Sequence, residues 1–172
     1  FFPPPNLHVG VPILDGLHLG VGVTFPYGLG IAWPEDWEGR LDLVSQNLQT
    51  INTNPNVAFR IPGFDLSVAL GAQIYYATVT LDQVFGLRDD VEVGAQLGGD
   101  GLGVGVTAAL MYKPTRELTI GLNYRSGTTI DFTGSVHFDG EEGTAFESTF
   151  VDQDISTSLS IPNAFTLGIG YQ

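Results

Sequence analysis

The chain has no cysteine, few basic residues and no long apolar run, and each absence narrows what it can be. Without Cys among its 172 residues it can form neither a disulfide framework nor a thiolate metal site. Six Lys and Arg stand against 19 Asp and Glu, giving a net charge of −13. With no basic stripe to neutralise phosphates, nucleic acid is not expected as a partner. No run approaches the ~20 apolar residues of a transmembrane helix.

Motifs of catalysis and of leader peptides are missing as well. The sequence contains no Gly-x-Ser-x-Gly elbow and no phosphate-binding loop, so we expect no enzyme and no cofactor. His8, His18 and His137 lack a metal-ligand spacing, and the acidic segments are expected to be solvated rather than to hold a metal. The start, FFPPPN, has neither the basic nor the apolar region of a signal peptide, which suggests a mature or truncated product.

What is present is a strict alternation of apolar with small or polar residues, clearest over 64–80. A β-strand sends successive side chains to opposite faces, so this pattern predicts one apolar and one small or polar face. The apolar set is Phe64, Leu66, Val68, Leu70, Ala72, Ile74 and Tyr76. The same alternation recurs over 102–112, 118–133 and 155–171. These stretches are long for a soluble sandwich, whose strands average about five or six residues, and they carry little charge.

The connections between the expected strands alternate short and long. We expect strands near 6–13, 17–26, 43–60, 64–82, 101–112, 117–138 and 153–171. Tight turns are expected at 14–16, 61–63 and 113–116, and long, acidic connections at 27–42, 83–100 and 139–152. Short turns at one end and long loops at the other are typical of an antiparallel outer-membrane β-barrel, and a soluble β-sandwich is the weaker alternative. Seven strands are an odd number, so part of a larger barrel is expected.

Several segments together resemble the FadL-type outer-membrane transporters of long-chain fatty acids or aromatic hydrocarbons. They are PNLHVGVPILDGLHLGVGVTFPYGLGIAWPEDWEGR, LQTINTNPNVAFRI, LSVALGAQIYYATVTL, GLGVGVTAALMYKPTRELTIGLNYRS and SLSIPNAFTLGIGYQ. The resemblance covers essentially the whole chain. It implies strands two to eight of a fourteen-stranded barrel, as one partial domain over 1–172, without the family's N-terminal hatch or its last strands. It also implies a multi-pass protein of the bacterial outer membrane, in contact with lipid and lipopolysaccharide.

The resemblance points to a passage for ligand through the wall. In the family, the segment that matches Phe25, Pro26, Tyr27, Gly28, Leu29 and Gly30 kinks inward and leaves a lateral gap. Pro26 removes a ladder donor and the glycines permit a bulge, which fits a kink. The alternative is an ordinary strand end that rises into a loop, with Tyr27, Trp33 and Trp37 as interfacial aromatics.

Polar residues on the opposite face are candidates for the lumen. Asn52, Asn54 and Asn56 share one strand face with Arg60, and they either contact a ligand or hatch or simply form the polar inner face. Arg125 and Asp131 are expected to lie on the same face of one strand, but too far apart along it to touch. The expected partner of Arg125 is either a ligand carboxylate or a structural acid.

Two functions fit this barrel. The first is passive uptake of hydrophobic small molecules, with lateral release near the expected kink. The alternative is a structural or adhesive outer-membrane barrel whose acidic loops contact a protein partner in a surface assembly.

Overall fold

The strands of this chain form one antiparallel sheet. The computed structural model describes residues 5–34, 36–86, 92–139 and 151–172. Its strands are β1 (Leu7–Leu14), β2 (Leu17–Thr24), β3 (Gly28–Ala32), β4 (Ser45–Ile61), β5 (Leu66–Gly86), β6 (Glu92–Tyr112), β7 (Leu118–Arg125), β8 (Thr128–Asp139), β9 (Gln153–Ile161) and β10 (Ala164–Tyr171). None of the described residues forms a helix long and apolar enough to cross a membrane.

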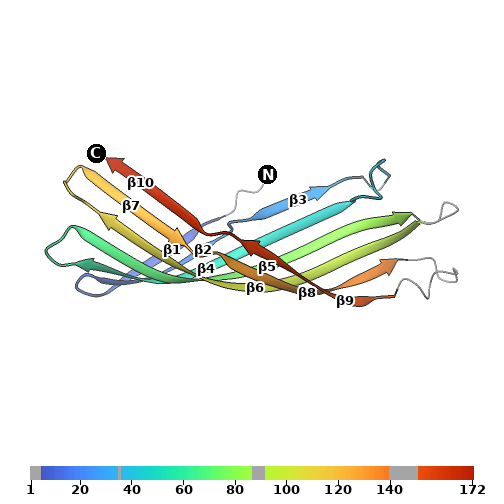
Figure 1. Cartoon of the computed structure of the whole chain (residues 1–172), viewed down its shortest axis with the longest axis horizontal. Helices are drawn as coiled ribbons and strands as arrows, with labels where there is room; N and C mark the ends of the chain where they lie inside the picture. Colours follow the sequence, from blue (N-terminus) through green and yellow to red (C-terminus); the bar gives the residue numbers. More distant parts are fainter. Residues whose placement is uncertain (1–4, 35, 87–91, 140–150) are drawn as a thin grey trace.

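The sheet is one open, curved wall. Its main order is β1-β2-β4-β5-β6-β7-β10, with β3 also on β4, β8 on β6 and β9 on β8. Each of the pairs β2 and β3, β7 and β8, and β9 and β10 therefore runs as one interrupted strand, so the ten segments follow the seven expected strand paths (Figure 1). The expected all-β antiparallel barrel wall is confirmed. The sheet does not close on itself, which is what we expect of one part of a barrel.

Two of the expected long connections differ from the structure. The segment 27–42 contains β3, which continues the pairing along β4. The segment 83–100 is mostly strand, because β5 and β6 stay paired from Leu66↔Tyr112 to Gly86↔Glu92. Residues 87–91 and 140–150 lie outside the described residues. The tight turns are confirmed, and Gly16 and Gly63 adopt φ values of 77° and 79° that favour glycine.

Curvature makes the two faces of the wall unequal. Side chains converge on a concave face, so burial identifies it, and the buried cluster of Tyr75, Ala77, Ile130, Phe132 and Ile161 lies there. Directly paired residues share a face, which lets the register assign every other side chain. Tyr75 pairs with Asn52 on one side and with Gly103 on the other, so these residues are concave as well.

The wall reverses its polarity about halfway along the strands. In the turn-side zone (7–24, 51–76, 102–125 and 164–171) the convex face is apolar. It carries exposed Val21, Val57, Phe59, Leu70, Ile74, Tyr76, Leu102, Val104, Val106, Leu122, Phe165, Leu167 and Ile169. Along β4, β5 and β6 this zone spans about 11 residues, the length of a membrane-crossing strand.

In the loop-side zone (28–34, 36–50, 77–86, 92–101, 128–139 and 151–161) the faces are exchanged. The convex face carries Asn47, Gln49, Thr78, Thr80, Asp82, Asp100, Asp131, Thr133, Ser135, Ser156 and Ser158. The concave face carries Leu29, Ile31, Leu48, Val79, Leu81, Leu97, Ile130, Phe132, Leu159 and Ile161. The apolar convex face of the turn-side zone suits contact with lipid. The apolar concave face of the loop-side zone suits an apolar barrel interior.

Candidate functional site

The first candidate site is the interruption between β2 and β3. Thr24 pairs with Asn52 and Gly28 pairs with Gln49, so residues 25–27 stand opposite only 50 and 51 of β4. The one extra residue makes a bulge, and it moves the odd-numbered apolar residues from the convex face in β2 to the concave face in β3. After this interruption the chain re-enters the sheet as β3, which pairs with β4.

A cavity of about 820 Å³ opens beside this interruption. It is lined by Pro5, by residues 25–30 and by residues 47–50. Among the described residues only β4 pairs with β3, and residues of both strands line this cavity. The six residues that the sequence singled out as a passage, Phe25 to Gly30, thus lie together on one side of one cavity in the wall.

The second candidate feature is the apolar concave surface of the loop-side zone. A smaller cavity of about 170 Å³ lies on it between β5, β6, β8 and β9. Its concave side chains include Val79, Leu97, Phe132 and Ile155. No charged side chain of the described strands faces this surface in the loop-side zone, because its acids lie on the convex face. The surface can bind apolar groups and excludes charged ones.

The polar residues expected in the lumen do lie on the concave face. Asn52 is 2% exposed and stands opposite Tyr75. Farther along β4, the Asn54 side chain donates to the Ala72 carbonyl at 2.5 Å and Asn56 donates to the Asn54 carbonyl at 3.1 Å. These contacts occupy Asn54 and Asn56 with the wall itself.

Arg125 and Asp131 do not share a face, contrary to the sequence interpretation. Arg125 pairs with Thr107 and Asp131 pairs with Leu102. The step of six residues from Arg125 to Asp131 therefore stands opposite a step of only five on β6, so the strand gains one extra residue between them. Arg125 is therefore concave and Asp131 convex, and Thr129 moves to the convex face with Asp131. Within the described part of the chain Arg125 makes no ion pair, which leaves its guanidinium open to the concave side.

The two N-terminal histidines share the concave face without standing opposite each other. His8 pairs with Gly22, and His18 pairs with Pro12. Both line one shallow cavity of about 270 Å³ together with Asn56. The His8 ring lies over Gly22, where a Cβ would come within 2.8 Å of its Nδ1. In the described ranges no three His, Asp or Glu side chains gather as metal ligands.

A second interruption, which the sequence reading missed, lies across the wall. Ser126 and Gly127 separate β7 from β8, and Pro162 and Asn163 separate β9 from β10. Asn163 Oδ1 joins the two gaps by accepting from the Gly127 amide at 2.8 Å and from the Tyr124 hydroxyl at 2.9 Å. Ser126 Oγ accepts from the Val106 amide at 2.8 Å, so side chains replace the interrupted ladder. The paired Ser-Gly and Pro-Asn steps were the signal in the sequence.

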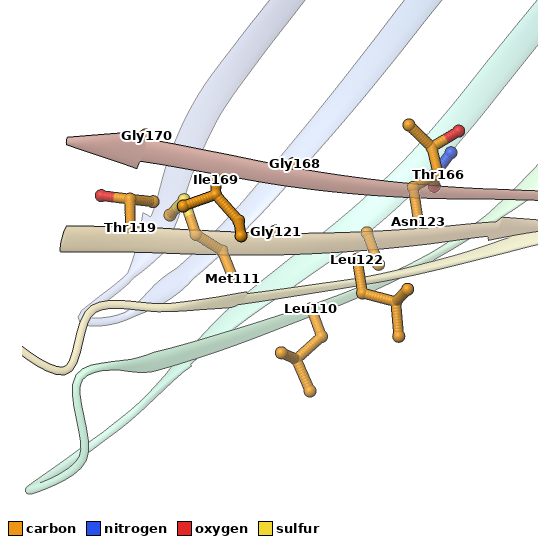
Figure 2. A pocket seen from close by; sticks show the side chains of 11 residues that line it. Leu110, Met111, Thr119, Gly121, Leu122, Asn123, Thr166, Gly168, Ile169 and Gly170 are labelled. Carbon is orange, nitrogen blue, oxygen red and sulfur yellow. The ribbon is translucent and has the colours of Figure 1, made fainter.

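Beyond this second interruption the concave face is built mainly from small and polar residues, with Met111 as a large apolar exception. A shallow cavity of about 520 Å³ lies there, along β6, β7 and β10. Figure 2 shows Leu110 and Leu122 pointing to one side of the sheet and Thr119 and Thr166 to the other. With Gly121, Gly168 and Gly170 contributing no side chain, this part of the turn-side zone leaves free space on its concave face.

The chain is similar to a known protein family and to curated proteins. The family model described as outer membrane protein transport protein (OMPP1/FadL/TodX) matches residues 4–172. A long-chain fatty acid transport protein of Escherichia coli O6:H1 is 27% identical over 197 residues, which cover 97% of this chain and 44% of that protein. The chain thus spans less than half the length of this curated relative.

Two solved structures share the fold. A FadL homologue of Pseudomonas aeruginosa superposes with a TM-score of 0.87 at 20% identity, covering 98% of this chain and 45% of that one. The toluene transporter TodX of Pseudomonas putida superposes with a TM-score of 0.67 at 14% identity, covering 98% of this chain and 50% of that one. The superpositions establish the same strand arrangement.

Proposed function

The chain belongs to the family of outer membrane protein transport proteins that includes FadL and TodX, and from this premise we propose that it serves the passive uptake of hydrophobic small molecules across the bacterial outer membrane. The ligands are long-chain fatty acids or hydrocarbons, in keeping with the names of its relatives. The 172 residues act as one part of a single barrel domain. The apolar convex face of the turn-side zone contacts lipid, and the polar convex face above it contacts lipopolysaccharide.

The reversal of polarity carries this proposal. A barrel with a water-filled channel has a polar lumen along its whole height. Here the loop-side zone turns apolar side chains inward, including Leu48, Val79 and Phe132. An apolar ligand that leaves water for this surface gains roughly 25 cal/mol for each Å² of apolar area that it buries.

The interruption at 25–27 supplies the exit in this proposal. It lies where the apolar concave surface meets the zone whose convex face is apolar. A ligand that passes sideways through the cavity beside Phe25 and Leu29 moves from an apolar interior into lipid without crossing water. For ligands with an acidic group, the open guanidinium of Arg125 is the proposed partner of the carboxylate, and Asn52 is a polar contact beneath the exit.

Uptake measurements with a one-residue deletion test the exit. Deleting Pro26 removes the extra residue opposite β4 and lets the ladder close across the gap. In cells that lack any other such transporter, we expect uptake of labelled palmitate and toluene to fall at least tenfold relative to the unaltered full-length protein. Deleting Pro114, which lies in a tight turn, is the matched control and should leave uptake within twofold. Unchanged uptake with the Pro26 deletion in a folded, heat-modifiable barrel would contradict the proposed exit.

The structural or adhesive alternative rests on the acidic loops. Most residues of the 139–152 connection lie outside the described residues, so no contact of that loop supports a protein partner. Loss of adhesion with intact ligand uptake on replacing Glu141 and Glu142 by Gln would favour the alternative.

A further inference from the structure

Two buried side-chain oxygen atoms that have no hydrogen-bond partner among the described residues belong to a residue pair next to the interruption at 25–27. They are Oγ1 of Thr24 and Oδ1 of Asn52. Thr24 and Asn52 are the last residue pair of the β2–β4 ladder before the bulge. Both side chains therefore project from the same, concave face, with Cβ atoms roughly 5 Å apart. Buried polar atoms in native proteins almost always have a partner, so a pair of orphans at one position calls for a molecule that satisfies both.

The pair adjoins residues that line the passage. Phe25, which follows Thr24, lines the cavity of about 820 Å³, and so does Thr50, the next concave residue of β4. Thr50 is itself satisfied, because its hydroxyl donates to the Tyr27 carbonyl at 2.8 Å. The neighbouring Asn54 and Asn56 side chains are hydrogen-bonded to the wall. Oγ1 of Thr24 and Oδ1 of Asn52 are thus unpaired next to two residues, Phe25 and Thr50, that line the cavity.

Resting on the function proposed above, we propose that Thr24 and Asn52 form a subsite for the hydroxyl group of an uncharged hydrophobic alcohol or phenol. The chemistry of the two atoms selects this class. A carbonyl oxygen such as Asn52 Oδ1 needs a donor, and the Thr24 hydroxyl both donates and accepts. A ligand hydroxyl donates to Asn52 and accepts from Thr24 in one placement. An ionised carboxylate is an acceptor only and leaves Asn52 Oδ1 unpaired, and a plain hydrocarbon leaves both oxygen atoms unpaired.

The body of such a ligand occupies the adjoining cavity. The cavity is lined by the apolar Phe25 and Leu29, and Phe25 directly follows Thr24 in the chain, so the proposed ligand places its ring or chain in the cavity and its hydroxyl at the polar pair. Discrimination follows from the cost of leaving buried polar atoms unpaired, which is why sites built to bond a hydroxyl reject analogues without one. A carboxylate, by contrast, is directed to Arg125 elsewhere on the concave face.

Binding of p-cresol and toluene, which differ only by the hydroxyl, tests the subsite. Dissociation constants are measured by isothermal titration with the purified full-length protein in detergent. We expect the unaltered protein to bind p-cresol at least tenfold more tightly than toluene. Asn52→Leu and the isosteric Thr24→Val should each weaken p-cresol binding severalfold or more while leaving toluene binding within twofold. Asn56→Leu, on the same face of the same strand, is the matched control and should change neither.

The outcomes separate this inference from the proposed function. If toluene binds and the unaltered protein prefers p-cresol by less than twofold, the subsite is overturned while uptake of hydrophobic molecules stands. The subsite is also overturned if p-cresol binding survives Thr24→Val and Asn52→Leu, because the two orphan atoms then bind only an ordered water. If palmitate, toluene and p-cresol all fail to bind and to enter cells, the proposed function itself fails. Should Asn52→Leu not fold, Thr24→Val alone decides, since it keeps the shape of the side chain.

Discussion

Tyr27 and Thr50 hold the interrupted wall together through hydrogen bonds in both directions. The Tyr27 amide donates to Thr50 Oγ1 at 3.0 Å, and the same hydroxyl donates to the Tyr27 carbonyl at 2.8 Å. The Thr50 amide also donates to that carbonyl, at 3.0 Å. One threonine side chain therefore replaces the ladder bond that the bulge removes, and it fixes where the chain re-enters the sheet as β3.

Replacing Thr50 by valine should destabilise the barrel. The change keeps the shape but leaves the Tyr27 amide without its acceptor, at a cost of about 1–3 kcal/mol in the free energy of unfolding. Guanidinium unfolding of the full-length protein in lipid vesicles measures it. Thr53→Val, on the convex face of the same strand, is the control, and it should change the free energy by less than about 0.5 kcal/mol. Equal effects at the two positions would show that the Thr50 hydroxyl does not hold the interruption.

Gly127 should tolerate no side chain. A Cβ at this position would lie 2.9 Å from the Ile161 carbonyl oxygen and 3.4 Å from the Asn163 nitrogen, both backbone atoms that cannot move aside alone. We expect Gly127→Ala to cost about 1–3 kcal/mol of unfolding free energy, as overpacking does. Gly121→Ala on β7 is the matched control, because nothing lies within 4 Å of its Cβ position. A Gly127→Ala barrel as stable as the Gly121→Ala barrel would refute the close approach of the two interrupted strands.

The reversal of polarity predicts where water reaches the convex face. Tyr76 and Thr78 lie two residues apart on that face of β5, one on each side of the reversal. This chain has no cysteine, so single cysteines introduced here can be labelled selectively in a full-length protein without other cysteines. On intact cells, Thr78→Cys should react with a water-soluble maleimide at least tenfold faster than Tyr76→Cys, because lipid covers the turn-side zone. Similar rates at both positions would mean that the membrane boundary does not lie between them.

An ion pair should make the 36–44 segment sensitive to acid. Arg40 Nη2 contacts Glu92 Oε1 at 2.6 Å, and its Nε donates to Oε2 at 3.2 Å. This hydrogen bonding lowers the pKa of Glu92 below its ordinary value. The stabilisation is therefore complete above the ordinary pKa of a glutamate and is lost as the pH falls through the lowered one.

Tryptophan fluorescence can report this loss, since the ring of Trp37 in this segment stacks on the ring of Trp33, which precedes the segment, with 4.9 Å between the ring centroids. We expect an acid transition in the fluorescence of the unaltered protein that Glu92→Gln removes. Because the pair is exposed, salt should weaken the effect. A transition that persists in Glu92→Gln would assign it to another group.

The alternation in the sequence predicted most of the wall but not its full length. Up to Tyr76 the even residues of β5 are apolar, and from Ala77 the odd ones are, through Val79 and Leu81. We expected a strand at 64–82 and a connection at 83–100. In the structure the strand simply continues with its faces exchanged, so the change of phase was the sequence signal for the reversal.

In the interrupted strands the sequence keeps its phase and only the tertiary structure decides the face. From Leu118 through Tyr124 to Ile130 and Phe132 the even residues remain mainly apolar. Between β7 and β8 the chain has one residue more than the part of β6 that it pairs with. This extra residue turns Ile130 and Phe132 to the concave face and Asp131 to the convex face, whereas Arg125 is concave. A single sequence cannot reveal how many partner residues stand opposite a segment, because register is a property of two strands.

The sequence by itself determined that this chain is an antiparallel wall with tight turns at one end, one apolar face and a break in the alternation at 25–30. Local alternation and turn chemistry suffice for that, because each depends on neighbours along the chain. The pairing of Thr24 with Asn52, the joint interruption at Gly127 and Asn163, and the inward-facing apolar surface were decided only when the strands paired. These features depend on which residues stand opposite one another, and the long-range register alone fixes that.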